Sequence, residues 1–308
     1  MLIEKQKMES LSEAMNEEAE KGRSPWADAR VRFFKNRQAV IGLCLLIFVL
    51  AFAIFGPFIA RWPIDEIDFM VMGDIARDGG PSFANGHYFG TDDLGRDLFA
   101  RTVLGTQISL AVGLIGAAIA VLVGTVYGAA SGFFGGRTDN VMMRIVDILL
   151  AIPYMFVLIL LLVMFGRSLV LLFVGIGLLS WLEMSRIVRG QTLSLKGREY
   201  IEAARATGVP SATIIRRHIV PNLLGVVIVY ATLLVPGMIL QESFISFLGL
   251  GVQEPLTSLG ALISEGAATM NYGTLWQLIF PLFFFIVTLF SFFFLGDGLR
   301  DALDPKDR

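Results

Sequence analysis

The sequence has little charge, one cysteine and two histidines, and each shortage excludes a class of protein. Only 17% of its 308 residues are charged, against about 25% in average soluble proteins, and 55% are hydrophobic. The single Cys44 excludes a disulfide framework, while His87 and His218 lie too far apart in sequence to suggest a zinc site. A net charge of −2 provides no basic field for nucleic acid. Because a soluble core of this composition would expose large apolar patches, we predict an integral membrane protein.

Sequence motifs for nucleotide binding and hydrolysis are also missing. There is no Gly-x-x-x-x-Gly-Lys-[Ser/Thr] phosphate loop, no Gly-x-Ser-x-Gly and no His-Glu-x-x-His. We therefore expect no catalytic residue, no metal site and no cofactor bound by this chain, which disfavours a membrane enzyme.

Six apolar runs approach the length of about 20 helical residues that a hydrocarbon core requires. They cover Ala39–Ala60, Ile108–Ser131, Val141–Phe165, Leu169–Leu182, Leu223–Leu240 and Trp276–Leu295. The fourth run has only 14 residues, so the placement of Lys and Arg decides whether it crosses. With six spans and both termini inside, 20 of these cations lie inside and five outside. We predict an all-α membrane protein with six transmembrane helices and two cytoplasmic termini.

The segments before, between and after the spans define the remaining units of the chain. Trp26, Phe33 and Phe34 alternate with basic residues, which predicts an amphipathic helix in the membrane interface; a charged linker is the alternative. The predicted units are a flexible cytoplasmic tail (1–22), the interfacial helix (23–38), the first span (39–60), an external loop (61–106), a core with the other five spans and the cytoplasmic loop 183–221 (107–296), and a cytoplasmic tail (297–308).

The external loop contains a cluster of aspartates, and its spacing does not fit an Asp-x-Asp-x-Asp-Gly calcium loop. A helix start fits better, with Thr91 as N-cap and Asp92 and Asp93 in the first turn, where acidic side chains face the positive helix end.

Two patterns inside the spans concern packing. Small residues recur every fourth position in the second span and predict close approach of a neighbouring helix, either as static packing or as a sliding contact. They are Gly116, Ala120, Gly124, Gly128 and Gly132. Prolines inside the third, fifth and sixth spans are predicted to kink them. They are Pro153, Pro236 and Pro281.

Three acidic residues lie in or beside apolar runs, where ionisable groups are candidates for function. Asp147 follows Arg144 by three positions and Glu183 precedes Arg186 by three, so each is expected to form an ion pair on its own helix. Glu242, near the outer end of the fifth span, is a candidate contact of a translocation path, with a structural role at a helix terminus as the alternative.

The loop 183–221 is basic and contains signals for two short helices. The first is predicted over Gly197–Thr207, and Gly208 follows it where a left-handed residue terminates a helix. Pro210 cannot continue the first helix but suits the start of a second, over Ser211–Ile219. A connection between two spans does not need such a rigid helix–turn–helix, whereas an element that docks on a partner does.

Glu202-Ala203-Ala204, followed by Gly208 and Pro221, resembles the EAA loop of bacterial ABC importer permeases. That pattern is Glu-Ala-Ala, three residues, Gly, nine residues and Ile-x-Leu-Pro; the spacings match, with His218 and Val220 at the Ile and Leu positions. Three further stretches resemble the peptide and nickel branch of this family, and within it the C subunits of oligopeptide permeases. They are Phe89–Asp97, Glu242–Gly251 and Gly296–Pro305.

This resemblance implies the type I ABC importer permease fold in a bacterial inner membrane, with a periplasmic loop 61–106 and a coupling role for the EAA loop. The coupling residues that it implies are Glu202, Ala203, Ala204, Arg205, Gly208 and Pro221. The implied partners are a second homologous permease subunit, two ATP-binding subunits that hold ATP and Mg, a periplasmic or extracellular peptide-binding protein, and membrane lipid.

The expected function is oligopeptide transport without catalysis by this chain. The alternatives are a dipeptide, glutathione or nickel permease of the same family, or an ion-driven secondary transporter, which the six spans alone permit.

Overall fold

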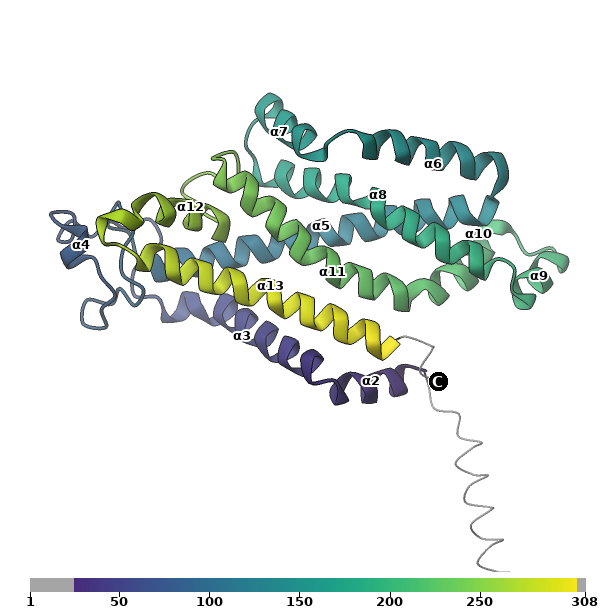
Figure 1. Ribbon diagram of the computed structural model, residues 1–308, viewed down its shortest axis with the longest axis horizontal. Helices are drawn as coiled ribbons and strands as arrows, with labels where there is room; N and C mark the ends of the chain where they lie inside the picture. Colours follow the sequence, from purple (N-terminus) through teal and green to yellow (C-terminus); the bar gives the residue numbers. More distant parts are fainter. Residues whose placement is uncertain (1–24, 304–308) are drawn as a thin grey trace, which may run out of the picture.

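The computed structural model describes residues 25–303, and within this range the chain is helical, with no β-strand. The predicted tail 1–22 and the residues from 304 onward lie outside the described residues. The long helices lie side by side in an elongated bundle, with α4 (Ile75–Asp78) and α9 (Glu199–Ala206) at opposite ends (Figure 1). The prediction of an all-α fold is confirmed.

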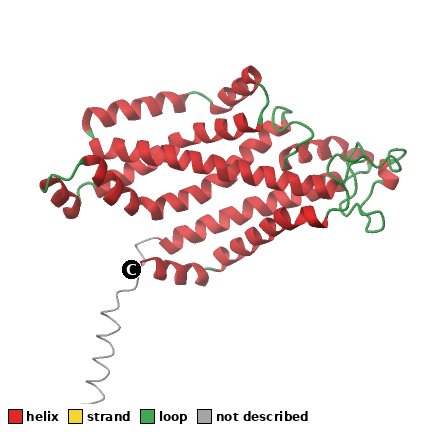
Figure 2. Cartoon of the chain, turned by 180° about the vertical axis from the view of Figure 1, so that it is seen from behind, coloured by secondary structure: helices red, strands yellow, loops and turns green. Residues whose placement is uncertain are grey.

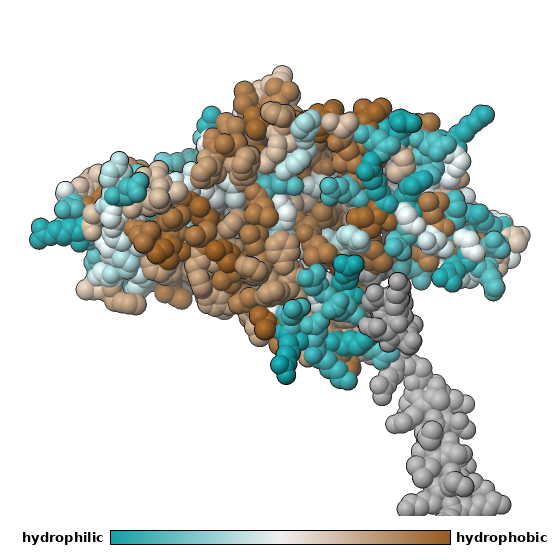
Figure 3. Space-filling view, in the orientation of Figure 1, coloured by the Kyte–Doolittle hydropathy of each residue, from teal (hydrophilic) through white to brown (hydrophobic). Residues whose placement is uncertain are grey.

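Within residues 25–303, five helical segments are long and apolar enough to cross a membrane. They are α3 (Arg37–Ile59), α5 (Leu98–Phe134), α8 (Leu169–Leu195), the continuous segment Ser211–Phe247 and α13 (Trp276–Leu303). The bundle has an apolar middle and hydrophilic ends (Figure 3), as expected for a protein whose middle contacts lipid. α8 continues beyond the apolar run Leu169–Leu182, so the fourth span is long enough to cross.

The third predicted span is broken in two. α6 (Gly136–Ala151) and α7 (Tyr154–Phe165) meet at an angle of 75°, and the six-span count is reached when this pair is taken as one span. Pro153 lies at the break and Ile152 has extended backbone angles, as expected for a residue that precedes proline. The predicted kink at Pro153 is confirmed, whereas Pro236 and Pro281 lie inside the continuous helices α11 (Val220–Phe247) and α13.

The second short helix predicted for the loop 183–221 is not a separate element. α10 (Ser211–Ile214) passes through a π-helical turn (η1, Ile215–Ile219) directly into α11. Pro221 lies just after this π-helical turn, where the helix passes into α11, and it does not end the helix. The fifth span thus begins at Ser211.

The ends of the bundle differ in composition, and we name them accordingly. The basic end carries α9, the end of α8, the end of α13 and α2 (Pro25–Lys35). The acidic end carries the segment 61–97, α12 (Leu259–Thr269) and the one-turn η2 (Met270–Tyr272), and most of the loops gather there (Figure 2). α5 extends between the two ends as one uninterrupted helix.

Close packing of α5 against α8 forms the centre of the bundle. A Cβ added at Gly124 would lie 2.8 Å from the carbonyl oxygen of Trp181, and one at Gly132 would lie 2.9 Å from that of Arg189. The same holds in the other direction, because a Cβ added at Gly177 of α8 would lie 3.1 Å from the carbonyl oxygen of Gly116 in α5. The small residues therefore bring the two backbones together, as predicted, and both helices belong to this chain.

Candidate functional site

The segment around α9 is a short helix closed by a glycine turn. Gly208 has φ +79°, its N–H donates to the carbonyl of Arg205 at 3.0 Å, and the N–H of Val209 donates to that of Ala204 at 3.0 Å. These two bonds form a Schellman motif, which needs a left-handed residue, and both Val209 and Ala204 pack against the apolar cluster that contains Ile201. The predicted left-handed conformation of Gly208 is confirmed, and α9 lies within the predicted Gly197–Thr207.

The two faces of α9 have different surroundings. Ile201 is 0% exposed and packs in an apolar cluster with residues of α5, α8 and α11. Glu202, Ala203 and Gly208 are exposed, and Ala204 is half-buried. One face thus fixes α9 to the bundle, and the other is open to a partner.

Arg205 and Pro221 are also exposed, and each has its own surroundings. The Arg205 guanidinium lies 4.5 Å from the centre of the Phe133 ring, at the end of α5, in a cation–π contact. Pro221 lines a pocket of about 1030 Å³ beside α9, together with Arg198, Tyr200 and Asn222. The structure therefore brings five of the six predicted coupling residues together on α9 and its turn, and places Pro221 at the adjoining start of α11.

Ion pairs at the basic end join helices that are distant in sequence. Asp139 in the first turn of α6 receives hydrogen bonds from Nε and Nη2 of Arg189 on α8, both at 2.6 Å, and from Ser131 of α5 at 2.5 Å. Asp147 pairs with Arg186 of α8, so its predicted pairing with Arg144 is wrong, and Arg186 is not directed to Glu183. The period of a single helix cannot indicate pairs that cross between helices.

Glu242 is 0% exposed and is surrounded by hydroxyl groups. Its carboxylate accepts hydrogen bonds from Ser246 at 2.6 Å and from Ser109 of α5 at 3.2 Å. The Ser109 hydroxyl in turn accepts the N–H of Leu259, in the first turn of α12, at 3.2 Å. In this conformation Glu242 does not reach solvent, and a contact with cargo stays a prediction.

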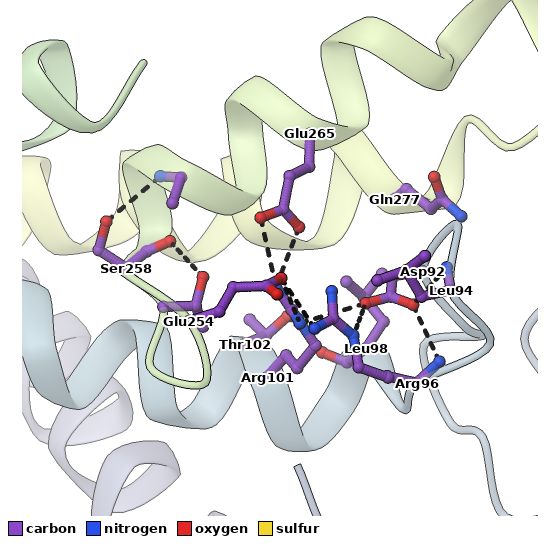
Figure 4. Close-up of polar contacts among 12 residues, drawn as sticks. Asp92, Leu94, Arg96, Leu98, Arg101, Thr102, Glu254, Ser258, Glu265 and Gln277 are labelled. Carbon is purple, nitrogen blue, oxygen red and sulfur yellow. Dashed lines mark hydrogen bonds and ion pairs between the residues drawn. The ribbon is translucent and has the colours of Figure 1, made fainter. Parts of the chain in front are cut away.

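A second cluster of charges lies at the acidic end, and Figure 4 shows Arg101 between Asp92 and Glu265. Arg101, in the first turn of α5, is 2% exposed; its guanidinium lies 3.3 Å from Asp92 and 3.0 Å from Glu265 of α12. Arg96 bonds Asp92 at 2.7 Å and Glu254 at 2.8 Å. We call these five side chains the outer ion cluster. It connects the segment 61–97, α5 and α12.

The outer ion cluster corrects the predicted role of the aspartates. α5 begins at Leu98 and its N-cap is Asp97, whose carboxylate accepts the N–H of Ala100 at 2.7 Å. Thr91 is therefore not the N-cap of α5. A segment with turns separates Thr91 from the start of this helix. Asp92 instead accepts the backbone N–H groups of Leu94 and Arg96, which folds this segment back on the two arginines.

The acids of the outer ion cluster differ in their preference for the ionised form. Burial raises the pKa of Glu265 above its usual range, although the Arg101 guanidinium opposes this. The hydrogen bond from Arg96 lowers the pKa of Glu254, more than its slight burial raises it. Acidification from neutral pH therefore neutralises Glu265 before Glu254, and a neutral side chain is better tolerated at position 265.

The same substitution is expected to have a large effect on stability at Asp92 and a small effect at Asp93. Asp92→Asn removes the charge that two buried arginines face and should lower the free energy of unfolding by about 2–4 kcal/mol. Asp93 is exposed, so Asp93→Asn should change it by less than about 0.5 kcal/mol. Thermal unfolding of the purified protein measures both, and equal midpoints would contradict the arrangement of the outer ion cluster.

Comparison with known proteins shows which family descriptions and which relatives the sequence matches. The family description "Binding-protein-dependent transport system inner membrane component" matches residues 122–308, and "N-terminal TM domain of oligopeptide transport permease C" matches residues 24–75. The chain is 52% identical to the oligopeptide transport system permease protein OppC of Haemophilus influenzae, over 98% of this chain and 95% of that one. Its identity to the protein of the same name from Escherichia coli K12 is 53% over all of both chains. The dipeptide transport system permease protein DppC of Bacillus subtilis is 43% identical over 97% of this chain and 92% of its own.

Proposed function

The chain belongs to the family of binding-protein-dependent transport system inner membrane components, and on this premise we propose that its transporter imports oligopeptides. It is a multi-pass permease subunit of the inner membrane and not an enzyme. The proposed cargo is supported by the names of its relatives, because the chain is 52–53% identical to oligopeptide permeases and 43% identical to a dipeptide permease. Competition of labelled oligopeptide uptake by unlabelled dipeptides tests this choice.

The observation that carries the coupling role is the divided surface of α9. Its inner face is fixed by the buried Ile201, and its outer face presents the exposed Glu202 and Ala203 beyond the end of the bundle. Small side chains permit close approach of a partner, and an exposed carboxylate accepts charge-assisted hydrogen bonds. We assign this face to an ATP-binding subunit, where ATP and Mg are held.

The proposed importer contains this chain, a second homologous permease subunit, two ATP-binding subunits and an external peptide-binding protein. ATP binding draws the ATP-binding subunits together, moves α9, and shifts the permease pair between inward-open and outward-open states. α2 lies in the membrane interface, since its Phe33 packs at the end of α13 whereas Trp26 and Phe34 are exposed.

The coupling role is tested by removing the exposed carboxylate. Glu202→Ala should leave membrane insertion unchanged, because no span is altered, and reduce both peptide uptake and co-purification of the ATP-binding subunits at least tenfold. Glu66→Ala removes a glutamate that is also exposed, at the opposite end, and should leave co-purification unchanged. Normal co-purification and uptake with Glu202→Ala would reject the role assigned to α9.

The proposed orientation places the basic end in the cytoplasm, because basic loops are retained there. In a Cys44→Ala background, a cysteine at the exposed Ser194 should react with an impermeant thiol reagent only after the cells are opened. A cysteine at Ala84, exposed in the segment 61–97, should react in intact cells. The reverse pattern would overturn the orientation.

A further inference from the structure

α5 connects the two sites described above, and its ends contact both of them. At the basic end, Phe133 lies in the last turn of α5, is buried in the cluster around Ile201, and lies under the Arg205 guanidinium. At the acidic end, Arg101 lies in the first turn and pairs with Glu265 of α12. A displacement of α9 is therefore applied directly to a helix that reaches α12.

Among the described spans, α5 and α8 are the two that contain neither a proline nor a break. The 37 residues of α5 contain no proline, and at about 1.5 Å per residue this helix is about 55 Å long. The spans α3, α11 and α13 contain Pro57, Pro236 and Pro281, and the third span is broken. Prolines and breaks are where helices bend, so α5 is suited to transmit a displacement along its length.

α8 reinforces α5 over its basic half. The backbones are in contact at the glycine positions, and the Lys196 ammonium at the end of α8 donates to the carbonyl of Gly132 at 3.0 Å. Asp139 bonds both Ser131 of α5 and Arg189 of α8. Interdigitated backbones leave little room for sliding, so the two helices form one rigid pair.

α12 joins α5 through one charged contact and several neutral ones. Glu265 is the sole charged residue in the sequence of α12, and its partner is Arg101. Neutral contacts also hold α12 to α11 and α13: a Cβ at Gly260 would lie 2.4 Å from Cα of Ser243, and one at Gly266 would lie 2.5 Å from the carbonyl of Gln277. α12 therefore has contacts with three spans, and its ion pair is with α5.

We propose that α5 and α8 move as one rigid pair that carries the displacement of α9 to the opposite end of the protein, and that the Arg101–Glu265 ion pair makes α12 follow α5. This deepens the proposed function, on which it rests. Glu265 is then a positioning residue: it touches neither nucleotide nor the docking face, and its loss separates ATP hydrolysis from transport.

Glu265→Gln is the appropriate test variant. Replacing Arg101 would leave Asp92 buried without one of its two cations, which endangers folding. Glutamine at 265 keeps the shape and a hydrogen-bonding group, and it changes the net charge of the outer ion cluster from −1 to zero. The change thus removes the ionic attraction with little change in packing.

The experiment uses the complete importer reconstituted in lipid vesicles, and it measures labelled peptide uptake and ATP hydrolysis together. Glu265→Gln should retain hydrolysis stimulated by the peptide-loaded binding protein and lower the peptide transported per ATP at least fivefold. Glu265→Asp, which keeps the charge, should give an intermediate ratio. Asp78→Asn, in the exposed pair with Arg77 at the same end, should match the wild type. A purely structural role would instead reduce assembly, hydrolysis and uptake in parallel.

A second measurement does not depend on the cargo. A spin label at the exposed Ala268 of α12, in a Cys44→Ala background, should change its mobility when a non-hydrolysable ATP analogue binds the partner subunits. The change should be absent in Glu265→Gln. An equal change in both proteins, or a normal ratio of peptide to ATP in Glu265→Gln, would overturn the inference. Absence of ATP-driven peptide uptake by the wild type would reject the proposed cargo alone, because the label response still reports on α12.

Discussion

Replacing Gly128 with leucine is expected to prevent stable assembly of the bundle. A Cβ at this position would lie 2.3 Å from the carbonyl oxygen of Ser185 and 3.0 Å from the backbone nitrogen of Arg189. Both atoms belong to the backbone of α8, so no side-chain rotation relieves the overlap and the helices must separate. Overpacking usually costs about 1–3 kcal/mol, and we expect at least the upper end of that range here.

The yield of monodisperse protein after detergent extraction and the thermal unfolding midpoint measure this effect. Gly190→Leu is the matched control, because Gly190 lies on α8, is exposed, and has open space where a Cβ would stand. We expect Gly190→Leu to behave like the wild type and Gly128→Leu to be recovered in much lower yield. Equal midpoints for the two variants would show that α5 and α8 are not held at this distance.

The local features of the fold were predictable because each depends on neighbours in the sequence. The apolar runs locate the long helices, the small residues of the second span locate its packing face, and Gly208 follows from the need for a left-handed residue. The continuity of η1 with α11 was not predicted, because the sequence around Pro221 does not show whether a helix ends before this proline or continues through it.

The charged contacts were not predictable, for a different reason. Arg101 and Glu265 are separated by 164 positions, and Arg189 and Asp139 by 50, so no periodicity connects them. The sequence does contain one signal for them: Arg96 and Arg101 lie next to an apolar run, both are buried in the fold, and buried arginines require acidic partners. That signal indicates that partners exist without identifying them.

Gly208→Val is expected to abolish peptide uptake while the protein still inserts into the membrane. Gly208 has φ +79°, a conformation that costs a residue with a Cβ roughly 1–2 kcal/mol and fits β-branched residues worst. A Cβ there would meet nothing within 4 Å, so any effect arises from the backbone and not from crowding. To relieve the strain the chain must give up the two hydrogen bonds that close α9, those from Gly208 and Val209.

Loss of these bonds changes the direction of α9 relative to α11, and the exposed face that carries Glu202 and Ala203 moves with it. Radiolabelled peptide uptake, normalised to membrane-inserted protein, should fall at least tenfold, and a pull-down should recover fewer ATP-binding subunits. Gly208→Asn is the graded control, because asparagine adopts the left-handed conformation more readily than other residues with a Cβ. It should keep most of the uptake. If valine and asparagine gave the same activity as glycine, the turn at Gly208 would have no part in coupling, and α9 would have to be positioned by Ile201 and Arg205 alone.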